Sequence, residues 1–184
     1  MTTARRANRG PSAAAENRRA LVAAAVEVFG EQGIDAPLSA VAKSAGVGQG
    51  SLYRHFPDRM SLALAAFEDN VAELEHLAAQ DETVLDDLLA LVTEQTLASV
   101  AFVEIVASAG DDDRLEAVTA RVSAALDRAV RDARRRGELR RGVTTSDILL
   151  ALGMVASLVA KSPADQRRST ADAAWKILHR GLDR

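Results

Sequence analysis

The chain of 184 residues contains no cysteine, which excludes disulfide bonds, thiolate metal sites and cysteine nucleophiles. Aromatic residues make up only 3% and alanine is abundant, a composition that favours helices. No apolar run approaches the roughly 20 residues that span a bilayer, and no apolar stretch follows the basic first ten residues. We therefore expect a cytoplasmic protein without a secretory signal and without membrane association.

Few residues in the sequence form a pattern typical of a metal-binding, phosphate-binding or catalytic site. The histidines His55, His76 and His179 lack the i,i+3 and i,i+4 spacings of a compact metal site. The glycine-rich run at 46–50 lacks the third-glycine spacing and the preceding strand of a phosphate-binding loop. No Ser/His/Asp arrangement is suggested. We expect no metal, no cofactor and no enzymatic activity; a small all-helical enzyme and an interaction-only helical bundle are the alternatives.

Charge is distributed unevenly along the chain. Residues 1–60 hold eight Lys and Arg against five Asp and Glu, a net charge of +3. Residues 61–184 hold 15 against 21, a net charge of −6. A basic N-terminal third on an acidic body favours the binding of a polyanion by the first third; a chance distribution of charge with a flexible basic tail is the alternative. The arginine cluster at 131–141 is typical of a solvated, dipole-stabilised helix end, and a second nucleic-acid patch is the less favoured interpretation.

Apolar residues recur at helical spacing, and no strand pattern or repeat is present. The spacing of glycines, prolines and capping residues predicts an all-α fold of about nine helices. Asp58 and Thr144 are the expected N-caps of two of them, and the stretch 84–109 is expected to be one kinked helix or two. The predicted regions are a flexible basic arm at 1–12, a three-helix domain at 13–60, a connecting fourth helix at 61–80 and a helical body at 81–184.

Residues 38–56 meet the requirements of a helix-turn-helix. The first short helix has an apolar inner face around Val41, the turn carries two glycines, and Leu52 and Phe56 anchor the second helix. The outward face of the second helix is small or polar, which allows it to enter a major groove. That outward face consists of Gln49, Gly50, Ser51, Tyr53, Arg54 and His55.

The segment LSAVAKSAGVGQGSLYRHFPDR, at 38–59, resembles the DNA-binding signature of the tetracycline-repressor (TetR) family, and the likeness extends over roughly residues 15–72. The Ala-Gly-Val turn, the Leu-Tyr-x-His-Phe core and the following basic residue fall in register. Gly48 replaces a frequent Ser, which removes a helix cap. Gln49 replaces a frequent Lys, which removes a phosphate charge and supplies an amide able to read adenine.

The resemblance implies an N-terminal helix-turn-helix domain followed by a ligand-binding and dimerisation domain. It implies a sequence-specific transcriptional regulator, a ligand-responsive repressor acting as a homodimer on a palindromic double-stranded operator. The residues expected to contact the DNA backbone are Ser39, Lys43, Tyr53, His55 and Arg59. The candidates for base edges are Gln49, Ser51 and Arg54, with phosphate contact an equal alternative for Arg54. Arg5, Arg6 and Arg9 either enter a minor groove or form a solvated tail.

In this family the body encloses an effector cavity between helices. A mostly aliphatic wall favours an apolar or amphipathic effector. Glu104 stands out in its apolar surroundings, because a buried carboxylate needs a partner or a ligand. The predicted ligand contacts are His76, Gln95, Thr96, Ser99, Phe102, Glu104 and Met154. For each polar residue, the alternative is a side chain that faces solvent or bonds to its own helix.

The segment 148–160 is apolar on all sides, so a single chain would leave part of it exposed. Together with the last helix it is expected to form a four-helix interface between two chains, related by a two-fold axis. The predicted interface residues are Leu152, Val155, Val159, Trp175 and Leu178.

Overall fold

The computed structural model describes residues 11–108 and 112–183. These residues form nine α-helices, one 3₁₀ turn and no strand, which confirms the all-α prediction. The helices are α1 (Pro11–Gln32), α2 (Leu38–Ser44), α3 (Gln49–His55), α4 (Arg59–Ala78), α5 (Leu85–Ala98), α6 (Val100–Ser108), α7 (Asp113–Arg136), α8 (Thr145–Ala160) and α9 (Arg167–Leu182). The arginines of the predicted basic arm lie outside the described residues, and Pro11 already belongs to α1.

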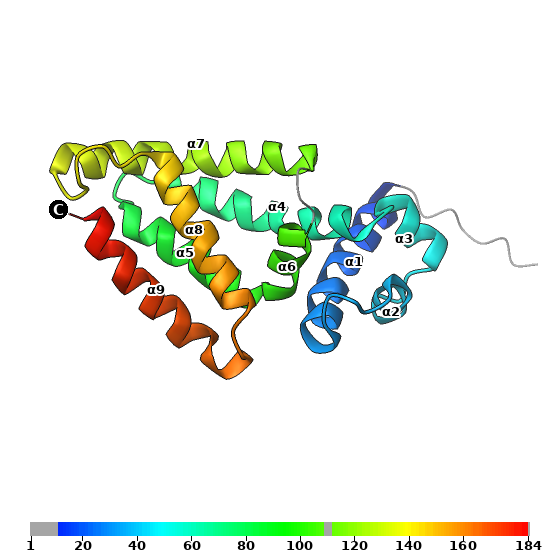
Figure 1. The fold of residues 1–184 in the computed structure, drawn as a ribbon. Helices are drawn as coiled ribbons and strands as arrows, with labels where there is room; N and C mark the ends of the chain where they lie inside the picture. The colour runs from blue at the N-terminus through cyan, green and yellow to red at the C-terminus, as the bar shows by residue number, and fades with distance from the viewer. Residues whose placement is uncertain (1–10, 109–111, 184) are drawn as a thin grey trace, which may run out of the picture.

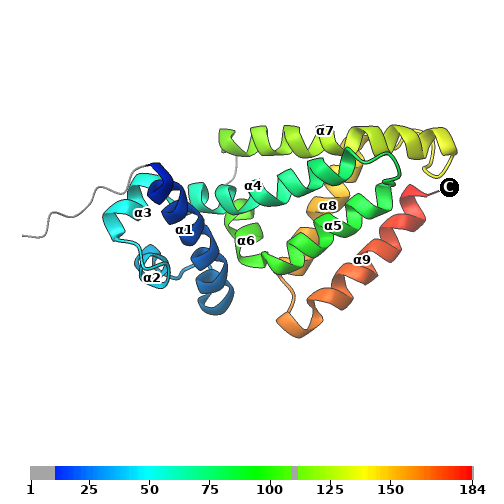
Figure 2. The ribbon, with the colours of Figure 1, turned by 180° about the vertical axis from the view of Figure 1, so that it is seen from behind.

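The helices form two regions joined by α4. Helices α1, α2 and α3 gather at one end of the molecule, and α4 runs from them along the body (Figure 1). Helix α7 lies beside α4, while α5, α8 and α9 form the other side of the body (Figures 1 and 2). The C-terminal end of α7 and the end of α9 therefore lie far from α2 and α3.

The core of the N-terminal region continues into the body. Phe29 of α1 and Leu52 of α3 are buried with apolar residues of α2 and α4. Phe102 of α6 belongs to the same cluster, and its ring centroid lies 5.7 Å from that of Phe29 in an edge-to-face arrangement. Helix α6 thus anchors the N-terminal region to the body through an apolar contact.

Helix ends are set by the residues that the sequence indicates. Asp58 caps α4 and Thr144 caps α8, and each forms a capping box with the residue three positions later. The apolar stretch after residue 84 forms two helices, α5 and α6, bent by 91° at their junction. Within the described ranges, no single helix is long and apolar enough to cross a membrane.

Candidate DNA-binding site and body cavity

Helices α2 and α3 are joined by a tight turn whose geometry depends on glycine. Gly46 has φ of +64°, a left-handed conformation that L side chains rarely adopt. The chain reverses there, and the Val47 amide donates a hydrogen bond to the Ala42 carbonyl at 3.0 Å. Gly48 occupies the N-cap of α3 without any side-chain hydrogen bond. The structure therefore agrees with the prediction that Gly48, in place of Ser, leaves α3 without a side-chain N-cap.

Helix α3 is held by its inner face and presents its outer face to solvent. Leu52 is 0% exposed and Phe56, just beyond the helix, is 2% exposed. On the outer face Tyr53 is 53% exposed, and Gln49 and Arg54 are also exposed. Because the inner anchors are buried, the orientation of this polar face is fixed by packing.

The remaining predicted DNA contacts surround this face. Ser39 and Lys43 are exposed one turn apart on α2, whereas Ser51 and His55 are half-buried on α3. The His55 ring packs against Phe56 with centroids 6.2 Å apart. The Arg54 Nε donates to the Gly50 carbonyl at 3.2 Å, so that this side chain lies back along α3.

Arg59 makes contacts that its position in the sequence does not reveal. Its guanidinium donates hydrogen bonds to the Ile34 carbonyl and, at 3.1 Å, to the Asp35 carbonyl. It also lies over the Phe29 ring, 5.4 Å from the centroid. The side chain therefore joins α4 to the loop after α1, and its predicted phosphate contact would be made from this position.

An ion-pair network links the start of α4 to the start of α7. Arg114 contacts the Asp58 carboxylate at 3.1 Å and the Asp112 carboxylate at 2.7 Å. Hydrogen bonds from Arg114 lower the pKa of Asp112 to about 2. Burial raises the pKa of Asp58, but hydrogen bonds from Ser61 and Arg114 outweigh this and leave the pKa below its usual value. Arg114 thus ties the body to the N-cap of α4. We call α1, α2 and α3, together with the first residues of α4, the reading domain.

A cavity of about 290 Å³ lies in the body between α4, α5, α6, α7 and α8. No charged residue is among the described residues that line it. Its polar groups come from Asn70, Gln95, Thr96 and Thr119. We call this space the body cavity. Its apolar lining residues are Leu64, Phe67, Val71, Leu74, Val92, Val103, Val106, Leu115, Val118, Val122, Leu149, Leu152, Gly153 and Ala156.

Two of the seven predicted ligand residues, Gln95 and Thr96, line the body cavity. The other five, which the structure places away from its wall, are His76, Ser99, Phe102, Glu104 and Met154. Phe102 packs into the N-terminal core, while Met154 is 48% exposed on α8. Phe67 and Thr119 were not predicted as contacts. The apolar stripes of α4 and α7 are the signal that could have found this wall.

The predicted dimer residues also occupy several environments. Val155 and Val159 are 2% and 0% exposed within the single chain, so they do not form its surface. Leu152 lines the body cavity. The Trp175 indole N–H donates to the Thr93 hydroxyl at 2.8 Å, and Leu178 of α9 is partly buried against apolar residues of α6, α8 and α9.

Other apolar side chains on these two helices face solvent. Leu150, Met154 and Leu158 recur every fourth residue along α8, with exposed fractions of 65%, 48% and 48%. Ile177 on α9 is 67% exposed. We call these four residues the apolar strip.

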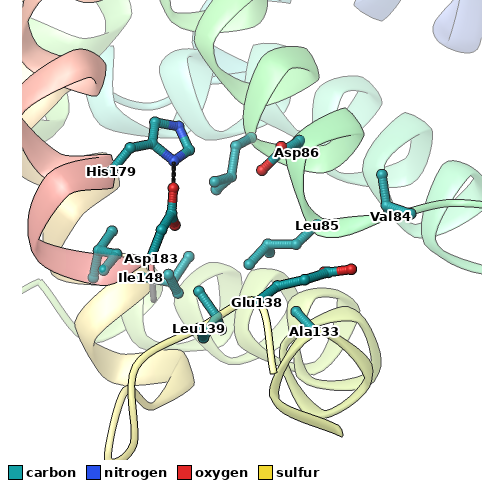
Figure 3. A pocket seen from close by; sticks show the side chains of 11 residues that line it. Val84, Leu85, Asp86, Ala133, Glu138, Leu139, Ile148, His179 and Asp183 are labelled. Carbon is teal, nitrogen blue, oxygen red and sulfur yellow. Dashed lines mark hydrogen bonds and ion pairs between the residues drawn. The ribbon is translucent and has the colours of Figure 1, made fainter. Parts of the chain in front are cut away.

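A second hollow, of about 370 Å³, lies at the end of the body remote from α3. Figure 3 shows Leu85, Leu139 and Ile148 in its wall, with His179 and Asp183 meeting beside them. The His179 Nδ1 lies 3.0 Å from the Asp183 carboxylate oxygen. Asp86 and Glu138 also line this hollow, so its wall combines acidic and apolar side chains.

Known proteins are similar to this chain in the sequence of its N-terminal region and in its overall fold. Residues 21–66 match a family model described as bacterial regulatory proteins, tetR family. A TetR transcriptional regulator from Streptomyces coelicolor is 29% identical over 90% of this chain and 98% of its own, with a TM-score of 0.59. A TetR-family regulator from Pectobacterium atrosepticum is 22% identical over 95% of this chain and 98% of its own, with a TM-score of 0.64.

A structure described as a gamma-butyrolactone receptor, an ArpA-like protein, is 19% identical over 93% of this chain and 90% of its own, with a TM-score of 0.59. No curated protein sequence matches the chain. The similarities to the family model and to the solved structures confirm the resemblance that the helix-turn-helix sequence indicates. The matched family consists of regulatory proteins, which supports a DNA-binding regulator rather than an enzyme.

Proposed function

We propose that this TetR-family chain is a transcriptional repressor that binds a palindromic operator as a homodimer and releases it when an uncharged effector fills the body cavity. The observation that carries the proposal is the outer face of α3, where Tyr53 is 53% exposed although Leu52 beside it is fully buried. An exposed aromatic ring next to polar side chains on an anchored short helix is suited to a major groove and its phosphates.

DNA reading is tested by selecting a duplex from random sequence with the purified chain. Gln49→Ala should relax preference at one base position and weaken cognate binding by about 1–3 kcal/mol. Lys43→Ala should weaken binding to all sequences and reduce the salt slope by about one unit. Lys161→Ala, at an exposed position after α8, is the matched control. A chain that selects no sequence would contradict the proposal.

Dimerisation is assigned to the apolar strip, because an exposed row of large apolar side chains on two packed helices favours self-association. Leu158→Arg should produce monomers in sedimentation and greatly weaken operator binding. Val84→Arg, at the 39% exposed N-cap position just before α5, should leave both unchanged. A wild-type chain that is monomeric at micromolar concentration would rule out the assignment.

The body cavity supports an uncharged, largely hydrocarbon effector, because a charged ligand would meet no counter-charge in the described wall. The Gln95 amide donates to the Asn70 carbonyl at 3.1 Å and to the Glu73 carboxylate at 3.0 Å. The Thr96 hydroxyl donates to the Val92 carbonyl at 2.8 Å. These donors are used, so the oxygens of both side chains are left to accept, and a ligand hydroxyl suits them.

Induction requires a difference in effector affinity between the DNA-bound and free arrangements. Helix α4 contributes Leu64, Phe67 and Leu74 to the cavity wall, and its first residues belong to the reading domain. A ligand that displaces this wall would therefore move α4. Effector titrations with and without operator should differ by a factor equivalent to about 1–3 kcal/mol. Equal affinities would leave a DNA-binding protein without induction.

A further inference from the structure

Positive charge is concentrated where α7 ends. Residues 131–141 hold six arginines against two acidic residues, a net charge of +4. The rest of 61–184 holds nine Lys and Arg against 19 Asp and Glu, a net charge of −10. The end of α7 therefore differs in sign from the body that carries it.

These arginines surround a wide hollow of about 910 Å³. We call it the arginine hollow; its lining residues are Arg131, Arg134, Arg135, Gly137, Leu139, Arg140, Arg141 and Gly142. No acidic side chain is among them. Gly137 and Gly142 have φ of +74° and +95°, so the backbone turns at positions that favour glycine. These turns bring Arg140 and Arg141 to the same hollow as the arginines of α7.

The positive charge of the arginine hollow is only partly neutralised. Arg131 lies 3.9 Å from Asp127, and Arg135 pairs with Asp132. In the described part of the chain no ion pair involves Arg134, Arg140 or Arg141. These partners leave a surplus of guanidinium groups at the hollow.

Arg140 is also held in place. Its Nε donates to the Asp183 carbonyl and its Nη2 to the Arg180 carbonyl, both at 2.9 Å. Its backbone amide donates to the Leu182 carbonyl at 2.8 Å. Carbonyl partners fix the guanidinium without cancelling its charge, so the hollow includes a positioned cation.

A helix dipole alone does not account for this arrangement. Cations within the last turn of α7 would be stabilised by the dipole, but Arg140 and Arg141 lie beyond the end of the helix. Leu139 lines both this hollow and the one in Figure 3, where Asp86, Glu138 and Asp183 supply carboxylates. The two neighbouring hollows therefore differ in charge, and only the arginine hollow suits an anion.

We propose that the arginine hollow binds the phosphate backbone of a second DNA duplex. Its described wall has no aromatic ring on which a base could stack and only Leu139 as an apolar side chain. Single strands, nucleotide bases and acyl chains would thus find little beyond charge. A duplex backbone needs only repeated guanidinium–phosphate contacts.

The position of the hollow also suits a second duplex. Figures 1 and 2 place the end of α7 at the opposite end of the molecule from α2 and α3. One duplex on α3 therefore leaves this end uncovered. Bridging of two duplexes rests on the proposed function, whereas binding at the arginine hollow does not.

The experiment separates the two surfaces in the full chain. Lys43→Ala, Tyr53→Ala and Arg54→Ala together disable the reading surface, and anisotropy then measures binding to a 20-base-pair duplex of random sequence. We expect binding to persist with a salt slope of about −3 to −4, a loss of about 100-fold between 50 and 200 mM salt. Adding four arginine-to-glutamine substitutions should abolish it. Those four positions are Arg131, Arg134, Arg135 and Arg141.

The matched control changes four cations of the body outside the hollow to glutamine, and it should retain the slope. Those positions are Lys161, Arg168, Lys176 and Arg180. Circular dichroism confirms that each variant is folded. Loss of all random-duplex binding with the reading surface disabled would overturn the proposal. So would four arginine substitutions that abolish binding to phosphatidylglycerol vesicles and leave duplex binding intact.

Failure of the proposed function gives a different result. The unmodified chain would then select no sequence and would be insensitive to the three reading-surface substitutions, while the arginine substitutions would still reduce random-duplex binding.

If both surfaces bind, two duplexes carrying different dyes should show energy transfer in the presence of the wild-type chain. That transfer should be lost in the four-arginine variant.

Discussion

The N-terminal region and the body are both helical, but they differ in how completely side chains fill the space between the helices. In the first, Phe29, Leu52 and Phe56 are at most 2% exposed, and short helices pack directly on one another. In the second, five helices line a partly open cavity of about 290 Å³. A filled interior holds a short helix in one orientation, whereas an unfilled interior leaves room for a ligand or for a second arrangement of its helices. The comparison predicts which substitutions each region tolerates.

The largest expected effect comes from emptying the filled interior. Leu52→Ala should lower the free energy of unfolding by about 2–5 kcal/mol, because Leu52 is fully buried and its neighbours collapse only partly. Leu152→Ala, which enlarges an existing cavity at a half-buried position, should cost less than half as much. Urea unfolding at one protein concentration measures both. Equal losses would remove the distinction between the two interiors.

Arg59 tests whether the first region depends on a polar clamp as well as on its core. Arg59→Ala removes hydrogen bonds to two carbonyls and the contact with Phe29, and should lower the free energy of unfolding by about 1–3 kcal/mol. Arg19→Ala, at an exposed position on α1, should change it little. If Arg59 also contacts phosphate, the salt slope of DNA binding should fall by about one unit. A stable variant with an unchanged slope would refute both roles.

Two glycines sharpen the comparison, because a Cβ added at either would meet no atom within 4 Å apart from those of its chain neighbours and of its own helix backbone. Backbone conformation alone then decides the outcome. Gly46→Ala should destabilise the turn by about 1–2 kcal/mol, since its φ is +64°. Gly153→Ala, inside α8, should stabilise the chain by up to about 1 kcal/mol. Thermal unfolding measures both variants, and unfolding temperatures that shifted in the same direction would contradict this interpretation.

The smallest effect is expected at the link between the regions. Arg114 is partly exposed and its ion pairs are screened by solvent, so Arg114→Gln should lower the free energy of unfolding only slightly at neutral pH. The pKa values of Asp58 and Asp112 are lowered in the folded chain. Their contribution to stability is therefore complete above the unfolded pKa, near 4, and is lost as the pH falls through the folded value, about 2 for Asp112.

The Arg114→Gln variant is also the control for the pH dependence of thermal stability. Between pH 4 and pH 2 the wild-type chain should lose more thermal stability than Arg114→Gln, and the two unfolding temperatures should converge at the acidic end. Arg168→Gln, which breaks the exposed pair with Glu94 within the body, should leave effector–operator coupling unchanged. Arg114→Gln should reduce that coupling. Parallel pH curves for the wild type and Arg114→Gln would show that Arg114 does not set these pKa values.

The sequence predicts the reading domain more closely than the body for a physical reason. The turn at Gly46 and the anchors Leu52 and Phe56 are encoded over a few residues, so local spacing is sufficient. Arg59 is an exception, because its carbonyl partners lie about 25 positions earlier in the chain. The bonds it makes depend on tertiary packing and leave no local signal.

In the body, periodicity loses its power where a helix is apolar all round. Helix α8 has Met154 exposed and Val155 buried, a difference that depends on the helices packed against it. Phe102 was expected at the ligand site, but the 91° bend between α5 and α6 directs it to the N-terminal core. Gln95 and Thr96 line the body cavity, and the sequence singles them out because polar side chains are conspicuous in an apolar stretch. The sequence of α8 therefore does not show which of its faces is buried and which is exposed.

The hydrogen bond from Trp175 to Thr93 has a spectroscopic consequence. The chain has one tryptophan and one tyrosine, and they lie in different regions: Trp175 joins α9 to α5, whereas Tyr53 lies on the outer face of α3. Indole emission therefore reports on the body, and phenol emission reports on the reading helix. Each region carries its own intrinsic chromophore, so unfolding, effector binding and DNA binding can be followed separately in the unlabelled protein.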